Sequence, residues 1–261
     1  MSDMMAIQVK DLKKHFGDVK AVDGISIEAS RGKIVALLGP NGAGKTTTIN
    51  LLTTQILPDG GTAKVMGYDV VEHPQQVRGR IGVTFQETSV DAALTGIQVL
   101  RFSGELNGMQ RRAINVRANE LLEMVGLTGA AKRKTKTYSG GMKRRLELAR
   151  SLMNTPDVLI LDEPTLGLDP QTRAKIWEYI DHLKEELGMT LLLTTHYMDE
   201  AEQLSDYVYI IDHGRIVKEG KPDELVREIG DDSIRLQGAG NIDRPNLGDV
   251  FFSVTGRAIR E

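Results

Sequence analysis

The chain has 261 residues, of which 40% are hydrophobic and 26% charged, and its formal net charge is −3 at pH 7. These values fit one large folded domain with small lobes rather than a disordered chain, and the near-neutral charge argues against a dedicated nucleic-acid binder. The sequence contains no cysteine, which excludes a disulfide scaffold, a cysteine zinc site, an iron–sulfur cluster and a thiol nucleophile.

The apolar segments are short throughout the sequence. Residues 1–8 lack the basic segment and apolar core of a signal peptide. The longest apolar runs, such as 34–38 and 158–161, are strand-like and far from the roughly 18 residues that a membrane helix requires. We therefore expect a chain that does not itself cross a bilayer.

Predicted strands and helices alternate along most of the chain. Apolar and polar residues alternate between residues 6 and 29, which predicts short, half-exposed strands. The nearly continuous apolar run at 33–38 predicts a buried parallel strand, and a glycine-rich loop and a helix at 46–54 follow it. Later strands are predicted at 62–68, 81–85, 158–161, 190–195, 207–211 and 216–218, and later helices at 172–187 and 198–204. This order is typical of a parallel α/β sheet.

Two segments depart from this alternation. Between about residues 91 and 151, apolar residues recur at helical spacing, which predicts a helical lobe inserted into the sheet-based core. From residue 230 onward the chain is richer in Gly and Asn. We therefore expect a main domain over residues 1–230, containing the lobe, and a short appendage over 231–261.

The glycine-rich loop matches the phosphate-binding pattern G-x-x-x-x-G-K-[ST], with a strand before it and a helix after it. Its glycines let backbone N–H groups converge on phosphate oxygens, and the helix directs its positive end at the same anion. Lys45 is expected to reach the β- and γ-phosphates, and the Thr46 hydroxyl to bind Mg²⁺. The loop predicts a nucleoside triphosphate without saying which one. Its candidate binding residues are Gly39, Pro40, Asn41, Gly42, Ala43, Gly44, Lys45, Thr46 and Thr47.

Two carboxylates, Asp162 and Glu163, end the apolar strand that starts at residue 158. An acid at the carboxyl end of a parallel strand faces the ligand crevice, so Asp162 is a candidate for holding Mg²⁺ through water. Neighbouring strand residues point in opposite directions, so Glu163 is expected to polarise the water that attacks the γ-phosphate. An acidic pair at a strand end can also serve only to solvate a turn, but the phosphate loop favours the catalytic interpretation.

His196 and Gln86 also follow predicted strands. An imidazole at the end of the buried strand 190–195 could donate a hydrogen bond to a γ-phosphate oxygen. Gln86 lies where the sheet meets the helical lobe and could contact the metal or the water, although many strands end in Gln. The remaining histidines occur in turn or helix-face contexts and are expected to be structural: His15, His73, His182 and His213.

A second helix begins with Ser139, Gly140 and Gly141. Ser139 is a natural N-cap, and this lead-in is a second geometry suited to binding an anion. One chain then has two helix amino termini suited to binding phosphate, but only one catalytic lysine. The simplest arrangement is two copies placed head to tail, with Ser139 of each copy on the nucleotide held by Lys45 of the other.

Taken together, these motifs resemble those of the nucleotide-binding subunits of ABC transporters, over about residues 6–230. Within that family the chain is similar to the ATPase subunits of drug exporters of the daunorubicin-resistance type, in the ABC-2 group. The resemblance is carried by YSGGMKRRLELA at 138–149, DEPTLGLDP at 162–170, TTHYMDEAE at 194–202 and LGDVFFSVTGR at 247–257.

The resemblance implies a P-loop NTPase core with a parallel sheet, an N-terminal antiparallel β-subdomain and an inserted helical subdomain. It implies that ATP is bound with Mg²⁺ and hydrolysed, with residues 39–47 as the Walker A loop and 158–162 as the Walker B strand. Glu163 then corresponds to the catalytic carboxylate, Gln86 to the Q-loop glutamine, which could touch the metal, and His196 to the switch histidine.

Three further correspondences concern a dimer and the adenine base. Residues 139–142 match the signature that binds ATP across a dimer, and 166–169 match the D-loop at its interface. Phe16 falls where the family has an aromatic residue stacked on adenine, and a phenyl ring can still stack. Met142 stands where the commonest signature has Gln, which removes one amide contact but leaves those of Ser139 and Gly141.

The partners that the resemblance implies are a second copy of the chain and a separate transmembrane permease. The chain would then lie in the cytoplasm at the inner face of the membrane and energise export, with drugs among the candidate substrates. Segment 91–96, after Gln86, is the candidate contact with the permease. The basic residues at 132–136 and 143–145 are interpreted as a solvated face, so no nucleic-acid partner is expected.

Two other classes of function compete with this hypothesis. A soluble ABC-type ATPase acting on DNA or ribosomes usually shows tandem cassettes or a long coiled-coil insertion, and neither is visible here. A catalytically inactive binding module is disfavoured because Lys45, Asp162, Glu163 and His196 are all present.

Overall fold

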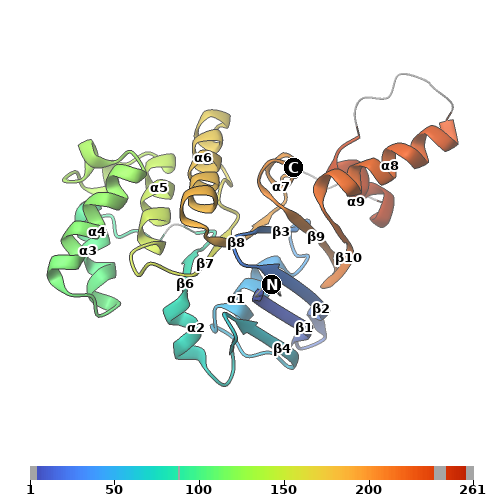
Figure 1. Cartoon of the computed structure of the whole chain (residues 1–261), viewed down its shortest axis with the longest axis horizontal. Helices are drawn as coiled ribbons and strands as arrows, with labels where there is room; N and C mark the ends of the chain where they lie inside the picture. Colours follow the sequence, from blue (N-terminus) through green and yellow to red (C-terminus); the bar gives the residue numbers. More distant parts are fainter. Residues whose placement is uncertain (1–4, 88, 238–244, 257–261) are drawn as a thin grey trace.

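The structure, a computed structural model, describes residues 5–87, 89–237 and 245–256. Two β-sheets form its centre, one with six strands in the order β10-β9-β3-β8-β7-β6 and one with four in the order β2-β1-β4-β5. Helices cover the outer face of the larger sheet and extend from both of its ends (Figure 1). The expected combination of a mixed, mainly parallel core with a smaller antiparallel sheet is confirmed.

The six-stranded sheet places the carboxyl ends of its central strands at one edge. Its strands are β3 (Ile34–Leu38), β6 (Ile81–Thr84), β7 (Val158–Asp162), β8 (Thr190–Thr195), β9 (Tyr207–Asp212) and β10 (Arg215–Gly220). Five strands run parallel, and β10 closes the edge as the antiparallel partner of β9. Leu38 pairs in register with Thr195, and Asp162 with Thr194, so the residues that follow β3, β7 and β8 emerge side by side.

The four-stranded sheet consists of β1 (Met5–Phe16), β2 (Val19–Ser30), β4 (Gly60–Val65) and β5 (Tyr68–Asp69). The first two strands are longer than the short strands expected from the sequence. Asp11 takes a left-handed conformation, with φ of 46°, and the pairing register shifts between Val9 and Leu12. Such a bulge lets a strand continue although its alternating apolar pattern is interrupted.

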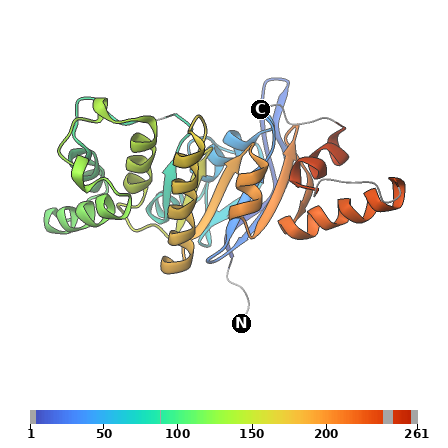
Figure 2. The same ribbon diagram turned by 90° about the horizontal axis from the view of Figure 1, so that it is seen from above.

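The helices form three groups around the sheets. Helices α1 (Lys45–Leu52) and α2 (Pro74–Arg80) contact strands of the smaller sheet. The helical lobe contains α3 (Gly96–Leu106), α4 (Arg111–Met124) and α5 (Gly140–Ser151), and it lies at the opposite end of the molecule from α8 (Pro222–Gln237) and α9 (Leu247–Thr255) (Figures 1 and 2). Between these ends, α6 (Pro170–Leu187) and α7 (Met198–Leu204) pack on the larger sheet.

Each face of the larger sheet has its own apolar core. Ile34, Ala36 and Leu38 of β3 belong to the core shared with the helices, whereas Val35 and Leu37 belong to the core between the two sheets. This alternation follows from the two-residue period of a strand. Because β3 is buried on both faces, the loop that follows it starts from a rigid position.

The carboxyl-terminal helices are attached to this core. Helix α8 runs across residue 230, where the main domain was expected to end. Leu247 and Phe251 of α9 are fully buried, and the Leu247 amide donates a hydrogen bond to the Glu202 carboxylate on α7. Residues 238–244 and 257–261 of the expected appendage lie outside the described residues. Within the described parts of the chain, no helix combines the length and hydropathy needed to span a membrane.

Candidate nucleotide site

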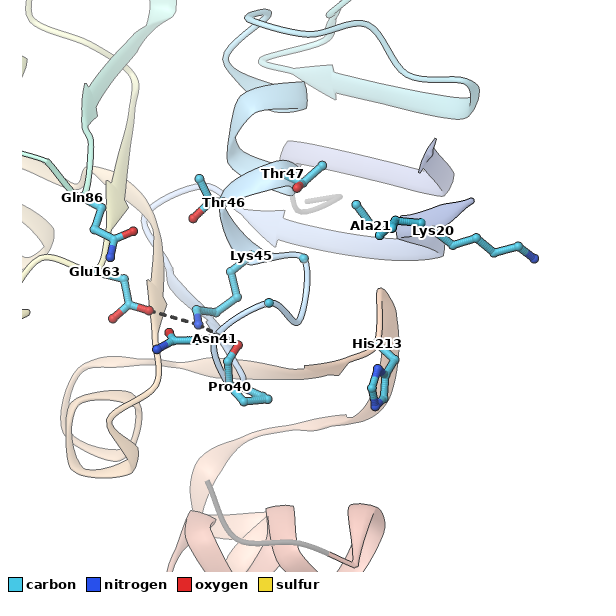
Figure 3. Close-up of a pocket in the computed structure, with 13 residues that line it drawn as sticks. Lys20, Ala21, Pro40, Asn41, Lys45, Thr46, Thr47, Gln86, Glu163 and His213 are labelled. Carbon is cyan, nitrogen blue, oxygen red and sulfur yellow. Dashed lines mark hydrogen bonds and ion pairs between the residues drawn. The ribbon is translucent and has the colours of Figure 1, made fainter. Parts of the chain in front are cut away.

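A cavity of about 580 Å³ opens at the carboxyl edge of the larger sheet, beside the glycine-rich loop (Figure 3). It brings together residues from the loop, from the smaller sheet, from the ends of β6 and β7 and from the β9–β10 turn. Its lining residues are Val19, Lys20, Ala21, Pro40, Asn41, Gly42, Gly44, Lys45, Thr46, Thr47, Gln86, Glu163 and His213.

The path of the loop requires glycine at two positions. A Cβ atom at Gly44, where φ is 110°, would lie 2.3 Å from the Ala21 carbonyl oxygen. A Cβ atom at Gly39 would lie 2.3 Å from the carbonyl oxygen of Ile211. Neither backbone oxygen can move aside without disturbing a strand. The loop therefore packs tightly between β2 and β9. The amino terminus of α1, which follows the loop, lies at the cavity.

Lys45, Glu163 and His196 form a buried chain of polar contacts. The Lys45 ammonium donates to the carbonyl oxygen of Gly39 at 2.7 Å and pairs with Glu163 Oε1 at 3.0 Å (Figure 3). Glu163 Oε2 lies 2.6 Å from Nδ1 of His196. The side chains of Lys45 and Glu163 are only 5% and 4% exposed. One carboxylate thus contacts both the lysine of the loop and the histidine that follows β8.

The backbone at Glu163 is in a conformation that side chains rarely adopt. Its φ is 50°, in the left-handed region. Such a conformation costs about 1–3 kcal/mol and is often found at functional sites. The amide of Glu163 donates to the backbone oxygen of Thr194, which ties this turn to β8. The turn directs the Glu163 side chain into the cavity, away from the direction that Asp162 takes.

Asp162 lies one residue earlier and faces Thr46. Its Oδ1 accepts hydrogen bonds from Thr194 Oγ1 at 2.6 Å and from Thr46 Oγ1 at 3.4 Å. Its Oδ2 is buried and has no hydrogen-bond partner among residues 5–87, 89–237 and 245–256. Burial raises the pKa of this carboxyl, while the hydrogen bonds from Thr194 and Thr46 oppose the shift. An unsatisfied carboxylate oxygen beside a threonine hydroxyl fits a divalent cation, because oxygen donors are what Mg²⁺ prefers.

The raised pKa of Asp162 leads to a prediction about stability in the absence of nucleotide and metal. A group whose pKa rises on folding stabilises the fold below its ordinary pKa, and this contribution is lost as the pH increases through the raised value. From about pH 4 up to the raised pKa, the stability of Asp162→Asn relative to the wild type should therefore increase with pH, and above that pKa the difference should level off. Thermal unfolding of both proteins across this pH range measures the difference, and a difference independent of pH would contradict the prediction.

A comparison with known proteins identifies the family. The family model described as "ABC transporter" matches residues 22–166. The daunorubicin/doxorubicin resistance ATP-binding protein DrrA of Streptomyces peucetius is 48% identical over 232 residues, which cover 89% of this chain and 70% of the relative. The chain belongs to the ABC transporter family. Its members of this type are ATP-binding, ATP-hydrolysing subunits, and the expected family and activity are confirmed.

Other relatives and solved ABC structures agree with this identification. The Nod factor export ATP-binding protein I of Ralstonia nicotianae is 44% identical, covering 89% of this chain and 72% of the relative. The structure of an ATP-binding subunit of an ABC transporter has a TM-score of 0.80 and 28% identity, covering 96% of this chain and 99% of that one. A dimeric ATP-binding cassette in a post-hydrolysis state with ADP and Pi has a TM-score of 0.75 and 26% identity, covering 82% and 98%.

Of two further predicted site residues, Gln86 lies in the cavity and Phe16 lies outside its lining. Gln86 lines the cavity, next to Glu163. Phe16 is 52% exposed at the end of β1, paired in register with Val19, and is not among the lining residues. Its stacking on adenine stays a prediction.

The signature residues lie outside this cavity. Ser139 and Gly140 are exposed at the start of α5, where the Ser139 hydroxyl accepts from the Met142 amide. A Cβ atom at Gly141 would come within 2.4 Å of Thr172 Cγ2, so the start of α5 packs closely against α6. The start of α5, which is predicted to bind an anion, thus faces outward.

His213 is a cavity residue that sequence reasoning assigned to a structural turn. The amide of Gly214 donates to the Ala43 carbonyl oxygen at 2.9 Å, which holds the β9–β10 turn against the loop. Figure 3 shows His213 on the opposite side of the loop from Glu163. The only signal for this placement was the hairpin turn itself, because the contact joins residues about 170 positions apart in the sequence.

Proposed function

We propose that the chain binds ATP with Mg²⁺ at this cavity and uses its hydrolysis to drive transport through a separate membrane permease. The observation that carries the catalytic part of the proposal is the buried chain from Lys45 through Glu163 to His196. In it the Lys45 ammonium and the His196 imidazole each contact the Glu163 carboxylate, which supports the roles proposed for the three groups toward phosphate and water. The experiment that tests the catalytic carboxylate is the substitution Glu163→Gln, which should lower ATP turnover while leaving ATP binding nearly unchanged.

In this proposal the loop amides and Lys45 hold the β- and γ-phosphates, so the phosphates compete with Glu163 for the lysine. Glu163 then accepts a hydrogen bond from a water molecule whose oxygen attacks the γ-phosphorus. As the water oxygen bonds to that phosphorus, the bond from phosphorus to the bridging oxygen breaks. The proton that the water gives up passes through Glu163 to the released phosphate, leaving ADP and phosphate as products. His196 orients Glu163 and donates to a γ-phosphate oxygen. Catalysis is mainly positioning and charge stabilisation, as in other phosphoryl transfers.

Thr46, Asp162 and Gln86 are the residues that would hold Mg²⁺. Thr46 and Asp162 are already in contact, and the buried Asp162 Oδ2 has no other partner among the described residues. Mg²⁺ usually takes few protein ligands and completes its shell with phosphate oxygens and water. When bound, it supplies positive charge against the phosphate oxygens.

We further propose that two copies enclose ATP, with the exposed Ser139 end of each copy facing the Lys45 cavity of the other. The outward-facing start of α5 and the dimeric cassette among the similar structures support this arrangement. The names of the relatives, which refer to drug resistance and Nod factor export, favour export. The chain would then be held at the inner face of the membrane by the permease, which would select the substrate.

The helical lobe offers a surface for the permease. Segment 91–96 is anchored by Thr135, whose hydroxyl donates to the Asp91 carbonyl oxygen and whose amide donates to that of Leu94. Next to it lies a cavity of about 410 Å³ between α3 and α4, lined by Leu94 and the half-exposed Phe102 among others. Ala92 and Ala93 are exposed beside this cavity.

We expect Ala92→Arg and Ala93→Arg to reduce transport by about tenfold or more while ATP hydrolysis by the isolated chain changes less than about twofold. A bulky charge at an interface blocks docking, whereas neither alanine contacts the nucleotide cavity. Transport into membrane vesicles that contain the permease, measured beside phosphate release in solution, separates the two activities. Val71→Arg, at an exposed position after the smaller sheet, is the control. Unchanged transport in both alanine variants would place the permease elsewhere.

A further inference from the structure

Arg144 of α5 is buried, with 6% of its surface exposed, and it reaches out of the helical lobe into the edge of the larger sheet. Its guanidinium donates to four backbone carbonyl oxygens. These are the oxygens of Pro164 at 2.7 Å, Phe85 at 2.6 Å, Asp162 at 2.8 Å and Glu163 at 2.9 Å. A planar guanidinium presents its donors in a fixed fork, so four simultaneous acceptors fix its position and theirs.

All four acceptors are backbone oxygens at, or next to, Glu163 and Gln86, which line the cavity. Three come from consecutive residues, 162–164, which form the strained turn that directs Glu163 into the cavity. The fourth, the Phe85 carbonyl oxygen, immediately precedes Gln86, another lining residue. One side chain therefore joins the backbone of the proposed catalytic carboxylate to the backbone of the Q-loop glutamine.

Two further side chains of α5 hold the chain beyond Gln86. Glu147, which is 1% exposed, accepts from the Ser89 amide at 2.8 Å, and it lies 3.4 Å from the Arg144 guanidinium. Arg150 donates to the Ser89 carbonyl oxygen and hydroxyl. Burial lowers the pKa of the Arg144 guanidinium, and the Glu147 carboxylate opposes that shift. Residues before and after Gln86 are thus both attached to α5.

Ser139 is the N-cap of the same helix, at the end that faces outward. Leu146 and Ala149 of α5 are buried in the core shared with the rest of the helical lobe. Arg144 follows Ser139 by five positions, so slightly more than one helical turn separates the outward-facing end from residue 144. A displacement of the start of α5 would therefore move the carbonyl oxygens that hold Glu163.

We propose that Arg144 is a positioning residue that sets the backbone of Glu163 and Gln86 and transmits the position of α5 to the hydrolytic site. The inference rests on the role proposed above for Glu163. Arg144 does not reach the cavity and acts only through the backbone that it holds. Its loss should therefore slow the hydrolytic step and leave ATP binding at the loop nearly unchanged.

The first test compares Arg144→Met and Arg144→Lys with the wild type, using the full chain with saturating ATP and Mg²⁺. We expect kcat to fall by about tenfold or more in the Met variant and by about threefold to tenfold in the Lys variant, since a single ammonium cannot reach all four oxygens. The Kd for ATP should change by less than about threefold. A kcat within about threefold of the wild type in a folded Lys variant would overturn the proposal. The Lys variant is therefore a sufficient test even if the Met variant does not fold.

Arg145→Met is the matched control, because it removes a guanidinium from the next position on the same helix. Arg145 donates to the Val125 carbonyl oxygen inside the lobe and makes no contact with residues 162–164 among the hydrogen bonds of the described residues. Its kcat should stay within about threefold of the wild type. An equal loss in the Arg145 and Arg144 variants would show that any disturbance of α5 has this effect, and the proposal would fail.

A double-mutant cycle with Glu163→Gln separates positioning from general damage. If Arg144 acts through Glu163, its loss matters less once the Glu163 carboxylate has been removed. Arg144→Met should therefore lower turnover by about tenfold in the wild-type background, but lower the residual turnover of the Glu163→Gln protein by less than about threefold. Equal losses in both backgrounds would contradict the proposal. Normal turnover in Glu163→Gln alone would instead overturn the proposed role of Glu163, so the two failures can be told apart.

Discussion

Replacement of Glu163 by Gln should lower ATP turnover by about 10³-fold while the Kd for ATP changes less than about threefold. Gln has nearly the shape of Glu but cannot polarise water as a carboxylate does. The Lys45 ammonium keeps the carbonyl oxygens of Gly39 and Pro40 as acceptors, so the loop is not disrupted. Phosphate release at saturating ATP and equilibrium binding of ATP measure the two quantities.

The slow variant should also retain the closed pair of copies, because ATP is bound but not consumed. Size-exclusion chromatography with light scattering, with and without MgATP, should show a dimer that persists only with the nucleotide. Glu87→Gln is the control, since Glu87 is an exposed carboxylate next to Gln86 and does not line the cavity. A Glu163→Gln protein that hydrolyses ATP at the wild-type rate would refute the assigned role.

The sequence was sufficient to predict the parts of the site that depend on chain-local patterns. The loop at 39–47 carries its phosphate-binding pattern in nine consecutive residues, and two of its glycines, Gly39 and Gly44, are required by backbone approaches that the structure shows. Asp162, Glu163 and His196 could be placed at one edge because buried parallel strands end together. Their individual partners, such as the Glu163–His196 contact, depend on strand order, which the sequence alone does not determine.

The parts that sequence reasoning missed are contacts between distant segments. Arg144 was interpreted as part of a solvated basic face over 143–145, which is wrong for this residue because it is buried. Its acceptors are backbone oxygens, which carry no residue-type signal. His213 reaches the cavity because β9 lies beside β3, so that its turn meets Ala43. The bulge at Asp11 similarly lengthens β1 beyond its alternating pattern.

Replacement of Lys45 is expected to weaken ATP binding strongly and to lower the thermal stability of the protein. In Lys45→Met, the Kd for ATP should rise by about 30-fold to 150-fold, which corresponds to about 2–3 kcal/mol for the loss of charge-assisted hydrogen bonds to phosphate. The substitution should also lower the thermal stability of the protein without nucleotide, because the buried Glu163 carboxylate keeps only His196 as a polar side-chain partner among the described residues. Calorimetric titration with MgATP and thermal unfolding measure the two effects.

Two variants distinguish a specific role of Lys45 from a general loss of positive charge. Lys20 also lines the cavity, but its side chain is 60% exposed, so Lys20→Met should raise the Kd for ATP by less than about threefold. Glu163→Gln removes the other partner of the ion pair and should be less destabilising than Lys45→Met, since the ammonium retains two carbonyl oxygens. If Lys45→Met bound ATP as tightly as the wild type, the phosphates would have to be held elsewhere, and the cavity beside the loop would lose its assignment.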